Sequence, residues 1–173
     1  MQTHLIGAYN VTNALAAIAV GHHFGVNAEQ AAEAIGKYMP TNNRSEMVKT
    51  THNTLIVDAY NANPTSMKAA LENFAAINAP HKMAILGEMR ELGEVSAQEH
   101  QKVAEQALTT GCEEVWLVGE AFQAFSELAD SIRWFPDVEA VTVALKDGDC
   151  PEGRLILIKG SNGTKLFKLP ALL

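Results

Sequence analysis

Residues 58–64 read Asp-Ala-Tyr-Asn-Ala-Asn-Pro and place an acid and two amides directly after the apolar run at residues 54–57. In an open parallel sheet, ligands bind outside the carboxyl ends of the strands, so polar side chains at such a place face a crevice. Asn63 can cap a helix that begins at Pro64, and a helix start offers free N–H groups to an anionic or carbonyl ligand. The run predicts a ligand site, although the same residues could simply end a strand and cap a helix.

A second polar loop follows the next apolar strand pattern, within residues 82–93. Arg90 offers a planar fork for a carboxylate or phosphate, and Glu88 can accept a hydrogen bond from an ammonium group. This loop would suit a zwitterion. Alternatively, Arg90 forms an ion pair with Glu91 or Glu94 on a solvated loop, which would contribute little to stability.

The last apolar run, residues 154–160, leads into Lys-Gly-Ser-Asn-Gly-Thr-Lys at residues 159–165. This loop is rich in glycine but does not match the phosphate-loop motif, and no dinucleotide fingerprint follows the first strand. At Gly87 and Gly160 the lack of a side chain could let a ligand come close, whereas Gly119 needs only strand-to-loop geometry. We therefore assign no phosphate loop to this chain.

Asn10 and Asn13 lie three residues apart near the start of an apolar helix predicted at residues 11–24, and so on one helix face. Such a pair can read a purine edge or merely cap the helix, and the spacing does not decide between the two. Arg44 follows the polar, turn-like residues 41–43, which form the best candidate domain boundary.

The rest of the chain alternates apolar runs of strand length with helix patterns. A second helix is predicted at residues 28–38, which makes a helical pair with the first. The predicted strands are residues 46–51, 54–57, 82–87, 113–119, 131–135 and 154–160, with a hairpin turn at 52–53, and the predicted helices are residues 64–74, 96–110, 121–129 and 138–145. This order predicts an α/β fold, a three-layer, mainly parallel sheet preceded by the helical pair.

The size of 173 residues fits one domain with a small appendage, and no apolar stretch approaches the roughly 20 residues that span a bilayer. The first residues lack the features of a secretory signal, so we expect a cytoplasmic protein. The net charge of −7 opposes nucleic-acid binding. The histidines show no metal spacing, and Cys112 and Cys150 are expected to be free thiols.

Taken together, these segments resemble the Mur ligase family, and in particular its branch that handles D-Ala-D-Ala. The runs Tyr-Asn-Ala-Asn-Pro and Gly-Glu-Met-Arg-Glu-Leu-Gly are specific to that branch. The matching segments are residues 7–17, 43–46, 58–67, 86–93 and 159–161, in the family's order and over essentially the whole chain.

The resemblance implies that residues 40–173 form the Rossmann-like Mur ligase C-terminal domain and that residues 1–39 are the last helices of the central ATPase domain. An N-terminal domain for the UDP-sugar, and the central domain's phosphate loop and magnesium ligands, would then precede this chain. The isolated fragment is expected to be inactive, and ATP and Mg²⁺ are cofactors of the full-length enzyme.

The implied reaction is the ATP-driven addition of D-Ala-D-Ala to UDP-MurNAc-tripeptide in peptidoglycan precursor synthesis, and so in cell wall biogenesis. The tripeptide carboxylate would become an acyl phosphate, which the dipeptide amine attacks. By position in the motifs, Asn10, Asn13, Arg44 and Asp58 are the expected nucleotide contacts, and Asn61, Asn63, Glu88, Arg90, Lys159 and Ser161 are candidates for dipeptide recognition or domain closure. No catalytic residue or metal ligand is assigned.

The chain departs from the family pattern in two places. Tyr9 stands where the family commonly has histidine, and after Ser161 the usual arginine and acidic residue are missing, with Asn162 and Phe167 nearby instead. A stand-alone binding module that kept the fold without the chemistry is the alternative reading. A related amide ligase acting on folate or another precursor is disfavoured by residues 60–64.

Overall fold

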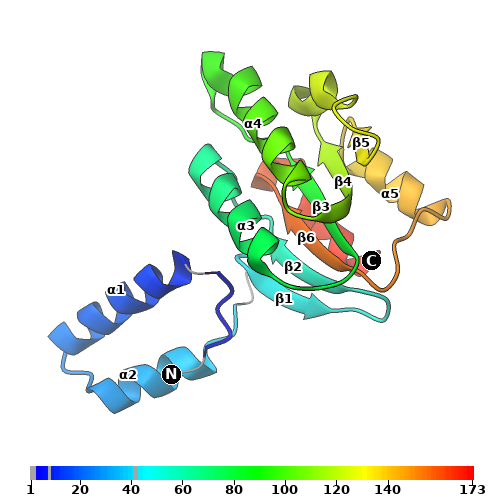
Figure 1. Ribbon diagram of the computed structural model, residues 1–173. Helices are drawn as coiled ribbons and strands as arrows, with labels where there is room; N and C mark the ends of the chain where they lie inside the picture. Colours follow the sequence, from blue (N-terminus) through cyan, green and yellow to red (C-terminus); the bar gives the residue numbers. More distant parts are fainter. Residues whose placement is uncertain (1–2, 8, 41–42) are drawn as a thin grey trace.

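The computed structural model describes residues 3–7, 9–40 and 43–173. Its centre is a sheet in the order β1-β2-β6-β3-β4-β5 (Figure 1). The strands are β1 (Glu46–Lys49), β2 (Thr54–Asp58), β3 (Lys82–Gly87), β4 (Cys112–Val118), β5 (Ile132–Phe135) and β6 (Leu155–Lys159). β1 runs antiparallel to β2, and the other neighbouring pairs are parallel, which confirms the predicted, mainly parallel sheet.

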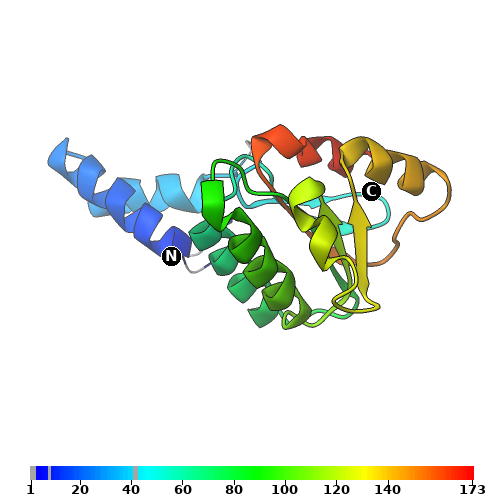
Figure 2. The ribbon, with the colours of Figure 1, turned by 90° about the horizontal axis from the view of Figure 1, so that it is seen from above.

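Helices cover both faces of the sheet and make the predicted three layers (Figures 1 and 2). The α-helices are α1 (Tyr9–His23), α2 (Ala28–Lys37), α3 (Pro64–Ala76), α4 (Ser96–Leu108) and α5 (Val138–Lys146), and the 3-10 helices are η1 (Gly93–Val95), η2 (Glu120–Phe125), η3 (Asn162–Thr164) and η4 (Leu166–Ala171). One core joins a sheet face to α3, α4 and η2, and the other joins the opposite face to α5 and η4. Strands buried on both faces explain the continuous apolar runs in the sequence.

The helix predicted at residues 121–129 is wrong, because the segment forms the short 3-10 helix η2 and then turns. Phe122 N donates to the Gly119 carbonyl at 3.1 Å and Ser126 N to the Gln123 carbonyl at 3.2 Å, both i to i−3 bonds. The segment must return quickly to the start of β5, and within η2 only Phe122 is buried. One anchoring side chain does not provide the apolar stripe that an α-helix would bury.

The helical pair formed by α1 and α2 stands away from the sheet and its covering helices (Figure 1). Asn27 caps α2 through a capping box with Gln30. Large apolar side chains on and after α1 are exposed, among them Val11, Leu15 and Phe24. The predicted pair is confirmed. The predicted boundary at residues 41–43 lies mostly outside the described part of the chain, which lacks residues 41 and 42. The side chain of Tyr9 also lies outside the described part.

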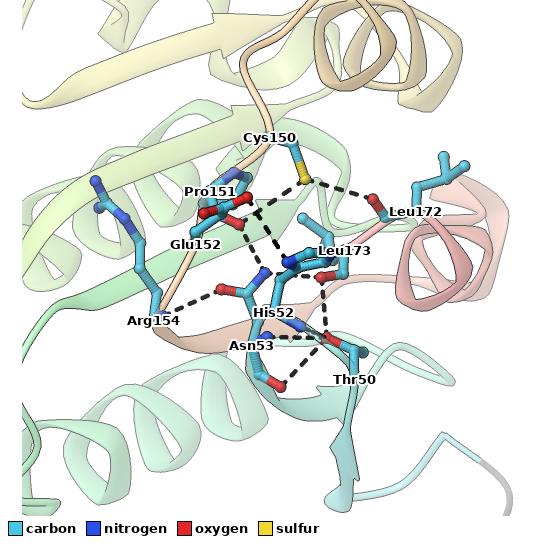
Figure 3. Close-up of polar contacts among 9 residues, drawn as sticks. All are labelled: Thr50, His52, Asn53, Cys150, Pro151, Glu152, Arg154, Leu172 and Leu173. Carbon is cyan, nitrogen blue, oxygen red and sulfur yellow. Dashed lines mark hydrogen bonds and ion pairs between the residues drawn. The ribbon is translucent and has the colours of Figure 1, made fainter.

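At the amino end of the sheet, the predicted hairpin turn at residues 52–53 also organises distant backbone (Figure 3). The buried Asn53 side chain donates through Nδ2 to the carbonyl oxygens of Pro151 and Leu173, each at 2.7 Å. Its Oδ1 accepts from the Arg154 amide at 3.1 Å. One side chain thus joins the β1–β2 turn, the approach to β6 and the last residue of the chain.

Cys112 and Cys150 are free, as expected. Burial raises the pKa of the Cys112 thiol, an effect that a hydrogen bond from Thr110 and the nearby charge of Lys82 partly offset. Within the described ranges, no helix has both the length and the apolar character needed to cross a bilayer.

Candidate functional site

β2 and β6 are parallel neighbours, and the chain leaves their carboxyl ends toward opposite faces of the sheet. From β2 the chain turns to α3 on one face of the sheet, and from β6 it turns to η4 on the other. Such a divergence opens a crevice at the strand ends. Here it contains a groove of about 670 Å³. Its lining includes these predicted site residues: Asn10, Asn13, Arg44, Asp58, Asn61, Asn63 and Lys159.

Asp58 and Lys159 end their strands as a register pair and form an ion pair of 2.7 Å between Oδ2 and Nζ. The lysine side chain is 1% exposed and that of the aspartate 17%. Nζ also donates to the carbonyl oxygen of Asn61 at 3.2 Å. Lys159 therefore fixes the Asp58 carboxylate and the loop that follows it. No other hydrogen bond to this carboxylate is found in the described part of the chain, so Oδ1 is available to a ligand.

Arg44 lies with its guanidinium carbon 4.0 Å from the centre of the Tyr60 ring, in a cation–π contact. Both side chains are exposed and line the groove. Tyr60 is not among the predicted site residues, although an aromatic residue two positions after Asp58 in a polar loop was a usable signal. The stack restrains Arg44, and no hydrogen bond or ion pair from the described residues occupies its N–H groups, which could therefore meet an anion.

The asparagines of the groove are partly engaged with their own chain. Asn13 Nδ2 donates to Asn10 Oδ1 at 3.0 Å, which confirms that the two share a helix face, and Asn10 Nδ2 donates to the Ile6 carbonyl at 2.7 Å. Asn63 Oδ1 accepts from the Ser66 amide at 2.8 Å and caps α3, with Pro64 in the first turn as predicted. Asn63 therefore does cap α3. Because its Oδ1 is held in the cap, the position from which its Nδ2 group could contact a ligand is fixed as well.

Glu88, Arg90 and Ser161 lie at the same edge of the sheet but do not line the groove. Glu88 follows β3, the neighbour of β6, and its Oε2 accepts from the Ala121 amide at 3.3 Å. Ser161 is 6% exposed, and its Oγ has no partner among the described residues. A buried hydroxyl without a partner is unusual, so Ser161 stays a candidate for a ligand contact.

Arg90 is exposed, and its Nη2 donates to the Gly163 carbonyl at 3.3 Å. Its Nε lies 3.8 Å from Glu88 Oε1. The alternative of an ion pair within this loop is thus met with a different partner, because the acid beside Arg90 is Glu88 and not Glu91 or Glu94. Through its bond to Gly163, Arg90 joins the loop after β3 to the loop after β6. Glycine at position 163 makes room for the guanidinium, since a Cβ there would lie 2.5 Å from Arg90 Cζ.

Gly87 and Gly160 make room for the protein itself. A Cβ at Gly87 would lie 2.7 Å from Thr164 Oγ1, and one at Gly160 would lie 3.0 Å from the Gly87 Cα. Contacts within the protein therefore explain glycine at both positions, without the close ligand approach that was expected. Gly119 has φ of +120°, which fits the expected strand-to-loop role.

Replacing Gly119 by alanine should destabilise the fold and displace Glu88, because a Cβ there would lie 2.6 Å from Glu88 Oε2. The backbone conformation alone costs a non-glycine residue about 1–3 kcal/mol. Gly148→Ala is the matched control, since φ is +110° and nothing lies within 4 Å of the added Cβ. Urea denaturation should show the larger loss for Gly119→Ala, and equal losses would contradict the clash with Glu88.

The described residues contain no group of three or more His, Cys, Asp or Glu side chains that could hold a metal ion. We assign no metal ligand to these residues.

Comparison with known proteins places residues 43–162 in a family described as Mur ligase, glutamate ligase domain. Proteins named UDP-N-acetylmuramoyl-tripeptide--D-alanyl-D-alanine ligase from Bacillus subtilis (strain 168) and Rickettsia prowazekii (strain Madrid E) are each 35% identical to the chain. The matches cover 95% and 94% of the chain but only 38% and 36% of the relatives. A crystal structure of MurF from Acinetobacter baumannii matches 95% of the chain and 37% of its own length, with a TM-score of 0.81 and 28% identity.

Proposed function

The chain belongs to the Mur ligase family, and we propose that it is the carboxyl-terminal part of an ATP-dependent ligase that joins D-Ala-D-Ala to UDP-MurNAc-tripeptide. The shared name of both relatives supports this activity, and their greater length leaves room for the domains that this chain would need. The observation that carries the proposal is the groove at the carboxyl ends of β2 and β6, which gathers most of the expected contacts.

We assign residues 1–39 to the end of a central domain and residues 40–173 to the C-terminal domain. The exposed apolar side chains of α1 support this division, because a helix that is apolar around its surface is normally buried. The position of the pair away from the sheet also supports it (Figure 1). The central domain of the full-length ligase would cover this surface.

For the nucleotide we assign Asn10, Asn13, Arg44 and Asp58. The groove volume lies in the range of small-ligand sites, and the exposed Arg44 guanidinium suits a phosphate. Oδ1 of Asp58, which has no partner among the described residues, can accept from a ribose hydroxyl, and the amides of the asparagine pair can meet the base. ATP supplies the phosphoryl group that activates the tripeptide carboxylate, and the Mg²⁺ ligands belong to the preceding domain.

For the acceptor dipeptide we assign Asn61, Asn63, Glu88, Arg90, Lys159 and Ser161. They act in different ways. Lys159 acts through Asp58 and the Asn61 carbonyl, whereas Ser161 offers a hydroxyl that has no partner among the described residues. Arg90 and Glu88 present opposite charges, as recognition of a zwitterion requires. Closure of this edge onto the central domain would exclude water from the activated carboxylate.

With these proposed substrates, we expect the ligase to act in the cytoplasm, in peptidoglycan precursor synthesis. The test is phosphate release by the full-length protein, which should need ATP, UDP-MurNAc-tripeptide and D-Ala-D-Ala together. Mass spectrometry should find the tripeptide precursor joined to the dipeptide with loss of water. The 173-residue chain alone should release no phosphate. Turnover that needs an amino acid and a folate, or that ignores D-Ala-D-Ala, would overturn the proposal.

A further inference from the structure

His100, in α4, is completely buried, and both of its ring nitrogens have partners. Nδ1 lies 2.7 Å from the Ser96 carbonyl oxygen, and Nε2 lies 2.9 Å from the backbone nitrogen of Met89. A carbonyl oxygen can only accept and a backbone amide can only donate. The ring therefore carries its proton on Nδ1 and accepts the Met89 N–H through Nε2.

The packing around the imidazole leaves it one orientation. Its ring meets Phe122 of η2 edge-on, at 4.7 Å between centroids and 84° between planes. The side chain of Met89 is buried in the core that α3, α4 and η2 cover. The imidazole thus lies between two helical elements and the loop that follows β3, and a rotated ring would lose both hydrogen bonds.

The loop at residues 88–93 needs such a support. Glu91 has φ of +63°, a left-handed conformation that a non-glycine residue keeps only where its surroundings impose it. Before it, the Glu88 amide donates to the Val118 carbonyl at 2.9 Å and the Met89 amide donates to His100. Arg90 follows at once and reaches Gly163.

We propose that His100 is a positioning residue for this loop, holding the Met89 amide and thereby setting where Glu88 and Arg90 stand at the carboxyl edge of the sheet. Its effect on the acceptor dipeptide rests on the proposed function. Its effect on the loop does not, because that effect follows from the two hydrogen bonds and the packing alone.

Two substitutions separate the two hydrogen bonds. The amide nitrogen of His100→Asn can take the place of Nδ1 and donate to Ser96, but nothing then accepts the Met89 N–H. The amide oxygen of His100→Gln can take the place of Nε2 and keep that bond. The two variants are similar in polarity, so a merely space-filling histidine would respond alike to both.

Amide hydrogen exchange of the 173-residue chain, followed by NMR, reads the loop directly. Exchange at Met89 should speed up about tenfold or more in His100→Asn and stay within about threefold of the unsubstituted chain in His100→Gln. The amide of Ile85, inside β3, is the internal control. Equal acceleration in both variants would overturn the proposal.

A nitrogen-15 spectrum of the unsubstituted chain tests which ring nitrogen of His100 carries the proton. It needs no variant, so the test remains possible even if His100→Asn does not fold. It should show a protonated Nδ1 and an unprotonated Nε2 on His100. A protonated Nε2 would refute the proposed acceptor.

In the full-length ligase, His100→Asn should raise KM for D-Ala-D-Ala about tenfold and leave KM for ATP within about twofold, with His100→Gln close to the unsubstituted enzyme. Equal changes in both KM values, or none, would refute the role in acceptor binding. If the unsubstituted enzyme forms no product from D-Ala-D-Ala, the proposed function fails. The two NMR measurements would then still test whether His100 positions the loop at residues 88–93.

Discussion

Asp58→Ala should lower the free energy of unfolding by about 3–5 kcal/mol, because it leaves the buried ammonium group of Lys159 without its counter-ion. With a side chain only 1% exposed, this lysine has almost no contact with water that could replace the lost carboxylate. The remaining bond to the Asn61 carbonyl does not balance a full charge. Urea denaturation of the 173-residue chain, followed by circular dichroism, measures the loss.

The chain offers a matched surface pair as the control. Lys168 and Glu139 lie 3.2 Å apart, with side chains 49% and 62% exposed. Glu139→Ala should cost no more than about 1 kcal/mol, because water screens both charges. Adding Lys159→Met to Asp58→Ala should recover much of the loss by removing the isolated charge. Equal costs for Asp58→Ala and Glu139→Ala would show that the ion pair at the strand ends is no more than a surface contact.

The same pair shows what the sequence can and cannot predict. The apolar runs that precede Asp58 and Lys159 predict two strands, and the alternation with helices predicts that these run parallel. Nothing local predicts that β6 lies between β2 and β3, because strand order depends on how distant segments pack. Asp58 and Lys159 are 101 positions apart, and only this order makes them partners.

In the candidate site, too, some features can be predicted from the sequence and others depend on how distant segments pack. The gathering of Arg44, Asp58 and Asn61 in one groove follows from polar residues at strand ends, which a sequence displays. By contrast, the burial of the Ser161 hydroxyl and the pairing of Arg90 with Glu88 depend on three loops from separate strands. His100 gave no signal, because a histidine inside a helix pattern looks the same whether it is buried or exposed.

Asn53 is the clearest residue that local sequence undervalued, since the pattern indicates only a turn. Asn53→Ala should leave the Arg154 amide without its partner and the Pro151 carbonyl with only the long contact from Cys150 Sγ, at 3.8 Å (Figure 3). Among the described residues, the backbone oxygen of Leu173 would keep only its bond from the Thr50 hydroxyl, at 2.9 Å. At about 1–3 kcal/mol for each unpaired buried group, we expect a loss of about 3 kcal/mol.

That loss corresponds to a fall in melting temperature of about 6–12 °C for a chain of this size, measurable by calorimetry. His52→Ala is the control in the same turn, because His52 and its partner Glu152 are both solvent-exposed, 3.6 Å apart, and should matter little. Asn53→Asp sharpens the test. It keeps the acceptor for the Arg154 amide but turns a carboxylate oxygen toward the Pro151 carbonyl oxygen and the backbone oxygen of Leu173, so it should destabilise at least as much as alanine. If aspartate instead restored the stability that alanine removes, the donor bonds to Pro151 and Leu173 would not be what holds this end of the sheet together.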